Sequence, residues 1–154
     1  VRCCASHGYD LLISFQQLSD DWHVDYEDSR KADGIILLGY GDYLQHRPRL
    51  EQLVERGTHF ICWGNPKAAE FGAVVGSDNE QGGFDGTQHL IEAGRRRIAF
   101  VGTASDAYPE FLDRHSGYCR AHAEAGLAAD PKLMVAAGPS EEEGRTAVAE
   151  LVRK

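Results

Sequence analysis

The 154-residue chain is 42% hydrophobic and 26% charged, which allows a buried core and excludes an intrinsically disordered protein. Its 16 basic and 24 acidic residues give a net charge of -8, so we do not expect this segment itself to bind a nucleic-acid backbone. No apolar run approaches the roughly 20 residues of a membrane-spanning helix, and the first residues lack the order of a secretory signal. We expect a soluble, cytoplasmic protein with one compact domain or two small lobes.

Short apolar runs rich in β-branched and aromatic residues alternate with helical patterns along the chain. A run without polar alternation, Ile35 to Leu38, predicts a strand that helices cover on both faces. The alternation predicts an α/β fold with a mostly parallel sheet and helices on both faces. The expected strands are 9–15, 34–39, 59–63, 73–76, 97–102 and 133–137.

Helices are expected between these strands, with glycines just after their ends. Ser140 and Glu143 form a capping-box pattern at the start of the last helix. Within the helix that follows residue 78, three glycines lower the helix propensity, so we expect close packing against the sheet or against a ligand. The predicted helices are 1–7, one with the stripe Leu50, Leu53 and Val54, 79–93, 112–125, and one with the stripe Ala147, Val148, Leu151 and Val152; the glycines are Gly82, Gly83 and Gly86.

The chemistry-bearing residues do not form a metal or catalytic pattern. Cys3, Cys4, Cys62 and Cys119 show no C-x-x-C spacing, so we expect thiols and no disulfide framework. His115, Cys119 and His122 would share one helix face, but that face is expected to pack on a sheet and lacks a fourth ligand. Because nucleotide-binding and nucleophile motifs are also absent, we expect no metal, no cofactor and no enzyme activity.

Two adjacent segments carry a resemblance to a known family. The sequence SDNEQGG at 77–83, followed by HLIEAGRRRIAFVG at 89–102, closely resembles the LacI/GalR family of bacterial transcriptional repressors. Further matches keep the family's order over about 120 residues, which is more specific than one motif. These matches are 32–37, 114–118, 126–127 and 140–144.

The resemblance implies a two-lobed sensor, like a type I periplasmic binding protein, that holds its effector in the cleft between the lobes. Residues 1–103 are then expected to form most of the N-terminal lobe, and residues 104–154 the start of an incomplete C-terminal lobe. Both ends are expected to be cut, with the DNA-binding head outside this chain.

The resemblance also implies the function of the chain. It is expected to be the ligand-sensing domain of a homodimeric repressor that binds a sugar-like effector and, through the absent head, operator DNA. The alternative is a periplasmic sugar-binding protein of a transport system. A signal peptide upstream would favour transport, and a helix-turn-helix would favour regulation.

Open parallel sheets bind ligands beyond the carboxyl ends of their strands, and several polar residues are expected there. Asp78 directly follows a strand. In one interpretation Asp78 or Asn79 only caps the next helix. In the other, Asp78 caps the helix and also accepts hydrogen bonds from ligand hydroxyls. Trp63 and Asn65 follow another strand and either border the cleft or serve packing and turn formation.

Arg114 matches the family arginine of R-x-x-G-[FYW], which implies a side chain that reaches into the cleft and holds ligand oxygens. The alternative from the residues alone is an exposed arginine paired with Asp113 or Glu110. Where family members often carry an aromatic platform for a sugar ring, this chain has Gly138 and Pro139, which puts stacking there in doubt.

Overall fold

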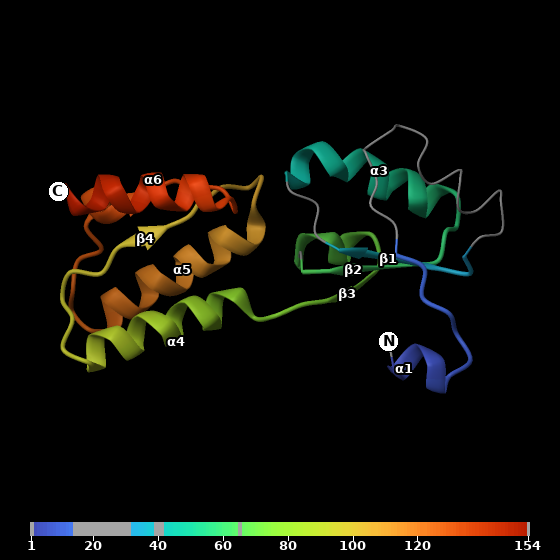
Figure 1. Ribbon diagram of the computed structural model, residues 1–154, viewed down its shortest axis with the longest axis horizontal. Helices are drawn as coiled ribbons and strands as arrows, with labels where there is room; N and C mark the ends of the chain where they lie inside the picture. Colours follow the sequence, from blue (N-terminus) through green and yellow to red (C-terminus); the bar gives the residue numbers. More distant parts are fainter. Residues whose placement is uncertain (1, 14–31, 39–41, 65, 154) are drawn as a thin grey trace.

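A computed structural model describes residues 2–13, 32–38, 42–64 and 66–153 (Figure 1). Its strands form two parallel sheets. The first sheet has the order β1-β2-β3, with β1 at Ile35–Leu38, β2 at Phe60–Trp63 and β3 at Ala73–Val75. The second sheet pairs β4, Phe100–Val101, with β5, Met134–Val135. The expected α/β class with parallel strands is therefore confirmed.

Three of the described helices begin at a side-chain cap, and α3, α4 and α5 end just before a glycine, as the sequence predicts for these ends. Side chains of Asp42, Asp78 and Ser140 accept backbone hydrogen bonds at the starts of α3, α4 and α6, while α5 begins with Pro109. The structure contains α1 at Arg2–Ser6, α3 at Tyr43–Glu55, α4 at Asn79–Glu92, α5 at Pro109–Glu124, α6 at Glu141–Val152, and the 3-10 helices η1 at Pro66–Glu70 and η2 at Pro131–Leu133.

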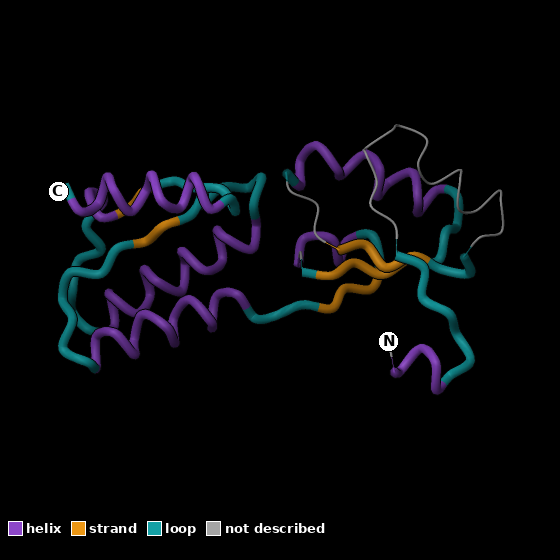
Figure 2. Tube along the Cα trace, viewed as in Figure 1, coloured by secondary structure: helices purple, strands orange, loops and turns teal. Residues whose placement is uncertain are grey.

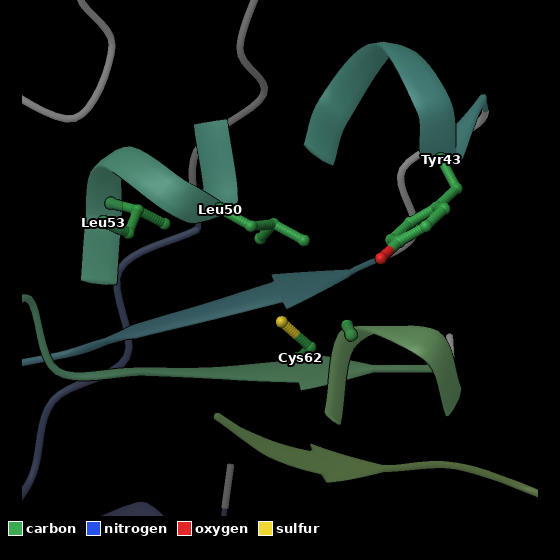
Figure 3. Close-up of a cluster of buried hydrophobic side chains, with 5 residues drawn as sticks. Tyr43, Leu50, Leu53 and Cys62 are labelled. Atoms are coloured by element: carbon green, nitrogen blue, oxygen red, sulfur yellow. The ribbon is translucent and has the colours of Figure 1, made fainter. Parts of the chain in front are cut away.

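The main core lies between the first sheet and α3 (Figure 3). In the parallel register Cys62 of β2 faces Leu37 of β1 on one side and Val74 of β3 on the other. These residues pack with the buried α3 side chains Leu50 and Leu53. On the opposite face of this sheet, Ile36, Leu38, Trp63 and Val75 are exposed among the described residues.

Helix α4 packs along α5 and belongs with the second sheet, not the first (Figure 2). At Gly83 a Cβ atom would overlap the backbone of Arg114, and at Gly117 it would overlap the backbone of Glu80 and Phe84. The close approach that the glycines predict is thus a helix–helix contact. Gly82 and Gly86 have open space where a Cβ would lie.

Several boundaries and faces differ from the sequence predictions. Residues 9–13 of the first expected strand have no regular structure, and 14–15 lie outside the described residues. The strands expected at 97–102 and 133–137 shorten to two residues each, since β4 and β5 pair only with each other in the described part of the chain. Val54, Val148 and Val152 are exposed, because no described element packs against them.

Candidate functional site

The candidate site begins at the carboxyl end of β3, where the chain enters α4. Asp78 is the N-cap of α4, and its Oδ1 accepts a hydrogen bond of 2.9 Å from the backbone N–H of Gln81. The expected cap is therefore confirmed. Asp78 remains exposed, so its second carboxylate oxygen is available to hydroxyl donors.

Asn79 and Arg114 are joined by a hydrogen bond between helices. Arg114 Nε donates to Asn79 Oδ1 over 2.9 Å, and Asn79 Nδ2 donates to the carbonyl of Ser77 over 3.3 Å. Asn79 is 8% exposed, so its amide fixes the arginine from a buried position. The Arg114 guanidinium also lies over the Phe111 ring, 5.4 Å from its centroid.

The expected alternative for Arg114, an ion pair with Asp113 or Glu110, is not formed in the described structure. Because Nε is used by Asn79, the terminal nitrogens of the guanidinium keep their donors for other partners. A planar fork with free donors suits the binding of hydroxyl or ring oxygens.

Asp78, Asn79 and Arg114 lie at one end of a groove of about 520 Å³. Ser77, Asp78, Asn79 and Arg114 form its polar end. The rest of the groove runs between α4 and β4 and is mostly apolar. It is lined by Gly82, Gly83, Gly86, Thr87, Leu90, Ile98, Ala99, Phe100, Val101 and Tyr118.

Further acidic residues lie near this polar end. Burial raises the pKa of Asp113, and the neighbouring charges of Glu80 and Asp78 raise it further, while Lys67 lowers it. A Cβ atom on Gly64, directly after β2, would lie 3.4 Å from the Glu110 carboxylate, so Glu110 reaches the end of the first sheet.

The loop before α5 contacts the first sheet's helices at two points. Tyr43 N–H donates to the carbonyl of Ala107 over 2.8 Å, and Lys67 Nζ lies 2.5 Å from Asp106 Oδ1. These contacts join the loop before α5 to α3 and η1.

The other candidate residues are not brought into this groove. Trp63 ends β2 on the face opposite α3, is 53% exposed and does not line the groove. Asn65 lies outside the described residues. In α5, His115 contacts Phe100 of the second sheet and Cys119 of its own helix, while His122 is buried and bonded to the Tyr118 carbonyl.

The described residues contain no group of three or more His, Cys, Asp or Glu side chains that could hold a metal ion. No described helix has the length and apolar character needed to cross a membrane.

Sequence reasoning missed Lys67, Asp106 and the position of the two α5 carboxylates near the polar end of the groove. One signal was available, because residues 110, 113, 114 and 117 have the i, i+3, i+4, i+7 spacing of one helix face. Nothing in the sequence indicated the pairing of Lys67 with Asp106, which are 39 residues apart.

Comparison with known proteins identifies the family of this chain. The fold is that of a periplasmic-binding-protein-like ligand-binding domain, and residues 2–154 match the family of periplasmic binding proteins and sugar-binding domains of the LacI family. The chain belongs to this family. The resemblance that the sequence motifs predict is confirmed.

Individual relatives of the chain are consistent with this family. The transcriptional regulator RafR of Escherichia coli is 30% identical over 157 residues, which cover 98% of this chain and 44% of RafR. The structure is similar to that of a CelR–cellobiose complex, with a TM-score of 0.77 and 25% identity over 97% of this chain and 46% of CelR. A LacI-family regulator of Chloroflexus aggregans gives a TM-score of 0.81 at 25% identity, over all of this chain and 54% of the regulator.

These relatives are transcriptional regulators and not enzymes. The chain spans less than half the length of the curated relatives that it matches.

Proposed function

We propose that this chain is the ligand-sensing region of a LacI-type repressor. It binds a sugar-like effector in a cleft between two lobes, and the effector controls how a head domain outside this chain binds operator DNA. The observation that carries the proposal is the Arg114–Asn79 hydrogen bond, which joins two motif segments 35 residues apart at one polar groove.

The proposed lobes differ in extent from those expected from the sequence. A boundary at residues 76–78, in place of 103, is supported by the packing of α4 on α5 through Gly83 and Gly117. Figure 2 shows the connection between β3 and α4 as an extended segment. The second lobe then supplies Asp78, Asn79 and Arg114, and the first supplies the residues after β2.

The chemistry of the polar end suits a polyhydroxyl ligand. The Asp78 carboxylate accepts hydroxyl hydrogen bonds, and Arg114 donates to hydroxyl or ring oxygens. The cellobiose complex of CelR, a structural relative of this chain, supports a sugar as the effector. Ligand-dependent reorientation of the lobes, transmitted through a homodimer, changes the spacing of two DNA-binding heads.

Arg114→Ala in the full-length protein tests the proposal. Operator affinity is measured by fluorescence anisotropy with and without cellobiose and raffinose. Wild-type protein responds to an effector sugar, whereas the variant binds operator normally and responds at concentrations about 10- to 100-fold higher, as expected for a lost charge-assisted hydrogen bond.

Arg145→Ala is the matched control, because Arg145 is exposed on α6 and pairs with Glu141 of the same helix. It is expected to respond like wild type. The proposal is contradicted if no small metabolite alters the operator affinity of the full-length protein. Sugar binding without operator binding favours the solute-binding alternative.

A further inference from the structure

The cleft-facing side of α5 carries two carboxylates beside Arg114. Glu110 and Asp113 precede Gly117 by seven and four residues, so they share its side of the helix. Gly117 lies against the backbone of α4, and the Glu110 carboxylate lies near Gly64 at the end of β2. These carboxylates therefore lie between α4 and the carboxyl end of the first sheet.

Of the three described cations around this point, two have acidic partners and Arg114 has a neutral one. Arg114 donates to Asn79, Lys67 pairs with Asp106, and Arg120 pairs with Glu80 over 2.6 Å. Neither Glu110 nor Asp113 has an ion-pair partner within the described ranges. Arg114 keeps its positive charge, because Asn79 is a neutral amide. Near this end of the groove, the described acids without an ion-pair partner, Asp78, Glu110 and Asp113, still outnumber that one cation.

The helix dipole stabilises the negative charge of only one of these two acids. Glu110 lies in the first turn of α5, where a negative charge is favourable. Asp113 lies one turn further, where that effect has largely fallen off, and it is partly buried. Burial raises the pKa of Asp113, and so do the charges of Glu80 and Asp78, while Lys67 lowers it; on balance the surroundings disfavour the ionised form.

We propose that Asp113, with Glu110, makes this cleft selective for an uncharged or amine-bearing polyol over an anionic one, such as a sugar phosphate or a sugar acid. The inference rests on the proposed function and names the substrate class of that site. Ionised carboxylates only accept hydrogen bonds, which sugar hydroxyls donate and the ionised oxygens of a phosphate or a sugar acid do not. Like charges within one cleft add repulsion, which suppresses anionic ligands.

The first test needs no sugar binding. Inorganic phosphate is titrated into the full-length protein, and its affinity is read from the shift in melting temperature. Wild-type protein is expected to bind phosphate only weakly, while Asp113→Asn with Glu110→Gln binds at least about fivefold more tightly, since two repelling charges are removed. No gain in the double variant overturns the inference.

Asp130→Asn is the matched control, because Asp130 lies beyond the other end of α5 and caps η2, a role that asparagine also fills. It is expected to leave phosphate binding unchanged. A gain equal to that of the cleft variants would overturn the inference, because it would show an effect of net charge alone.

The second test compares glucosamine, glucose and glucose 6-phosphate, and then cellobiose and cellobionate, on the full-length protein by calorimetry. The anionic member of each set is expected to bind at least about tenfold more weakly than the neutral one, and Asp113→Asn narrows that ratio severalfold. Glucosamine is expected to bind at least as tightly as glucose. An anionic member that binds wild type as tightly as its neutral partner overturns the inference.

If no sugar binds but the phosphate test gives the expected gain, the charge selectivity is supported and the proposed sugar effector is contradicted. The two hypotheses therefore fail separately.

Discussion

Gly83 of α4 lies directly against the backbone of Arg114 of α5, so close that any side chain at residue 83 would overlap the Arg114 carbonyl. Gly117 makes the reciprocal approach to Glu80. These two close backbone contacts, within one helical turn of each other, hold the start of α4 against α5. This packing sets the distance across which Arg114 reaches Asn79.

Gly83→Ala is therefore expected to separate the two helices. The added methyl group overlaps backbone atoms, which cannot rotate away, and overpacking of this kind costs about 1–3 kcal/mol of unfolding free energy. The shift also lengthens the Arg114–Asn79 hydrogen bond, so effector affinity falls. Urea unfolding and effector titration of the full-length protein measure both effects.

The same helix supplies the control. Gly82→Ala and Gly86→Ala place a methyl group in open space, and alanine favours a helix interior over glycine by about 1 kcal/mol. These variants are expected to be as stable as wild type or more stable. If alanine at residues 82, 83 and 86 changed the free energy of unfolding equally, the close helix contact would not contribute to stability.

The features that the sequence predicted well are local. The caps at Asp78 and Ser140 follow from hydrogen bonds that span three residues, so residue type and spacing are sufficient. The family motifs also placed Asp78, Asn79 and Arg114 in the same candidate site. The bond between Arg114 and Asn79 itself joins distant segments, and no local pattern specifies it.

The wrong predictions concern faces and edges. Val148 and Val152 continue the apolar stripe of α6, yet only Ala147 of that helix is buried. A periodic stripe shows which face a helix offers to a neighbour, but burial also needs that neighbour. Among the described residues α6 packs mainly against the short sheet of β4 and β5, which covers part of the stripe.

Asp106→Asn tests whether the loop before α5 helps to hold the proposed lobes together. The Lys67–Asp106 pair is exposed, so its loss is expected to change the unfolding free energy by less than about 1 kcal/mol. If the pair favours the closed cleft, effector affinity falls by about two- to fivefold, because part of the binding energy is then used for closure. Calorimetry on the full-length protein measures the change.

Arg145→Ala again serves as the comparison, since it breaks an exposed ion pair within a single helix. It is expected to leave effector affinity unchanged. Were Asp106→Asn to lower stability and leave affinity untouched, the pair would serve folding and not closure.

Ser140→Ala removes one half of the capping box at the start of α6. The Ser140 hydroxyl accepts from the backbone N–H of Glu143 over 3.2 Å, and the Glu143 carboxylate accepts from the Ser140 backbone. Loss of such a cap destabilises proteins by about 1 kcal/mol. Thermal unfolding is expected to show this loss for Ser140→Ala and a much smaller one for Ser140→Thr, which keeps the hydroxyl; equal losses would contradict the cap.

Tyr43 connects α3 to η1 and makes stability depend on alkaline pH. Its hydroxyl donates to Glu70 Oε1 over 2.6 Å, while Arg47 lies 3.7 Å from the same oxygen. Burial, and then the hydrogen bond to Glu70, raise the pKa of Tyr43 from 10.0 to about 12. The unfolded chain therefore loses this proton first as pH rises.

Between pH 10 and pH 12 the unfolded state binds fewer protons than the folded state, so the free energy of unfolding falls as pH rises. The Tyr43 contribution is present in full below pH 10, and about 2 kcal/mol of it is lost by pH 12. Tyr43→Phe is expected to be about 1–2 kcal/mol less stable than wild type at pH 8, because the hydrogen bond to Glu70 is missing.

The difference between wild type and Tyr43→Phe should accordingly shrink as pH rises from 10 to 12, as urea unfolding at a series of pH values would show. Burial also raises the pKa of Tyr118, so both proteins lose some further stability at alkaline pH. This loss cancels when the unfolding free energies of wild type and Tyr43→Phe are subtracted. Tyr9→Phe, at an exposed residue, is expected to follow wild type throughout. A constant difference across this range would mean that the folded core does not hold the Tyr43 proton.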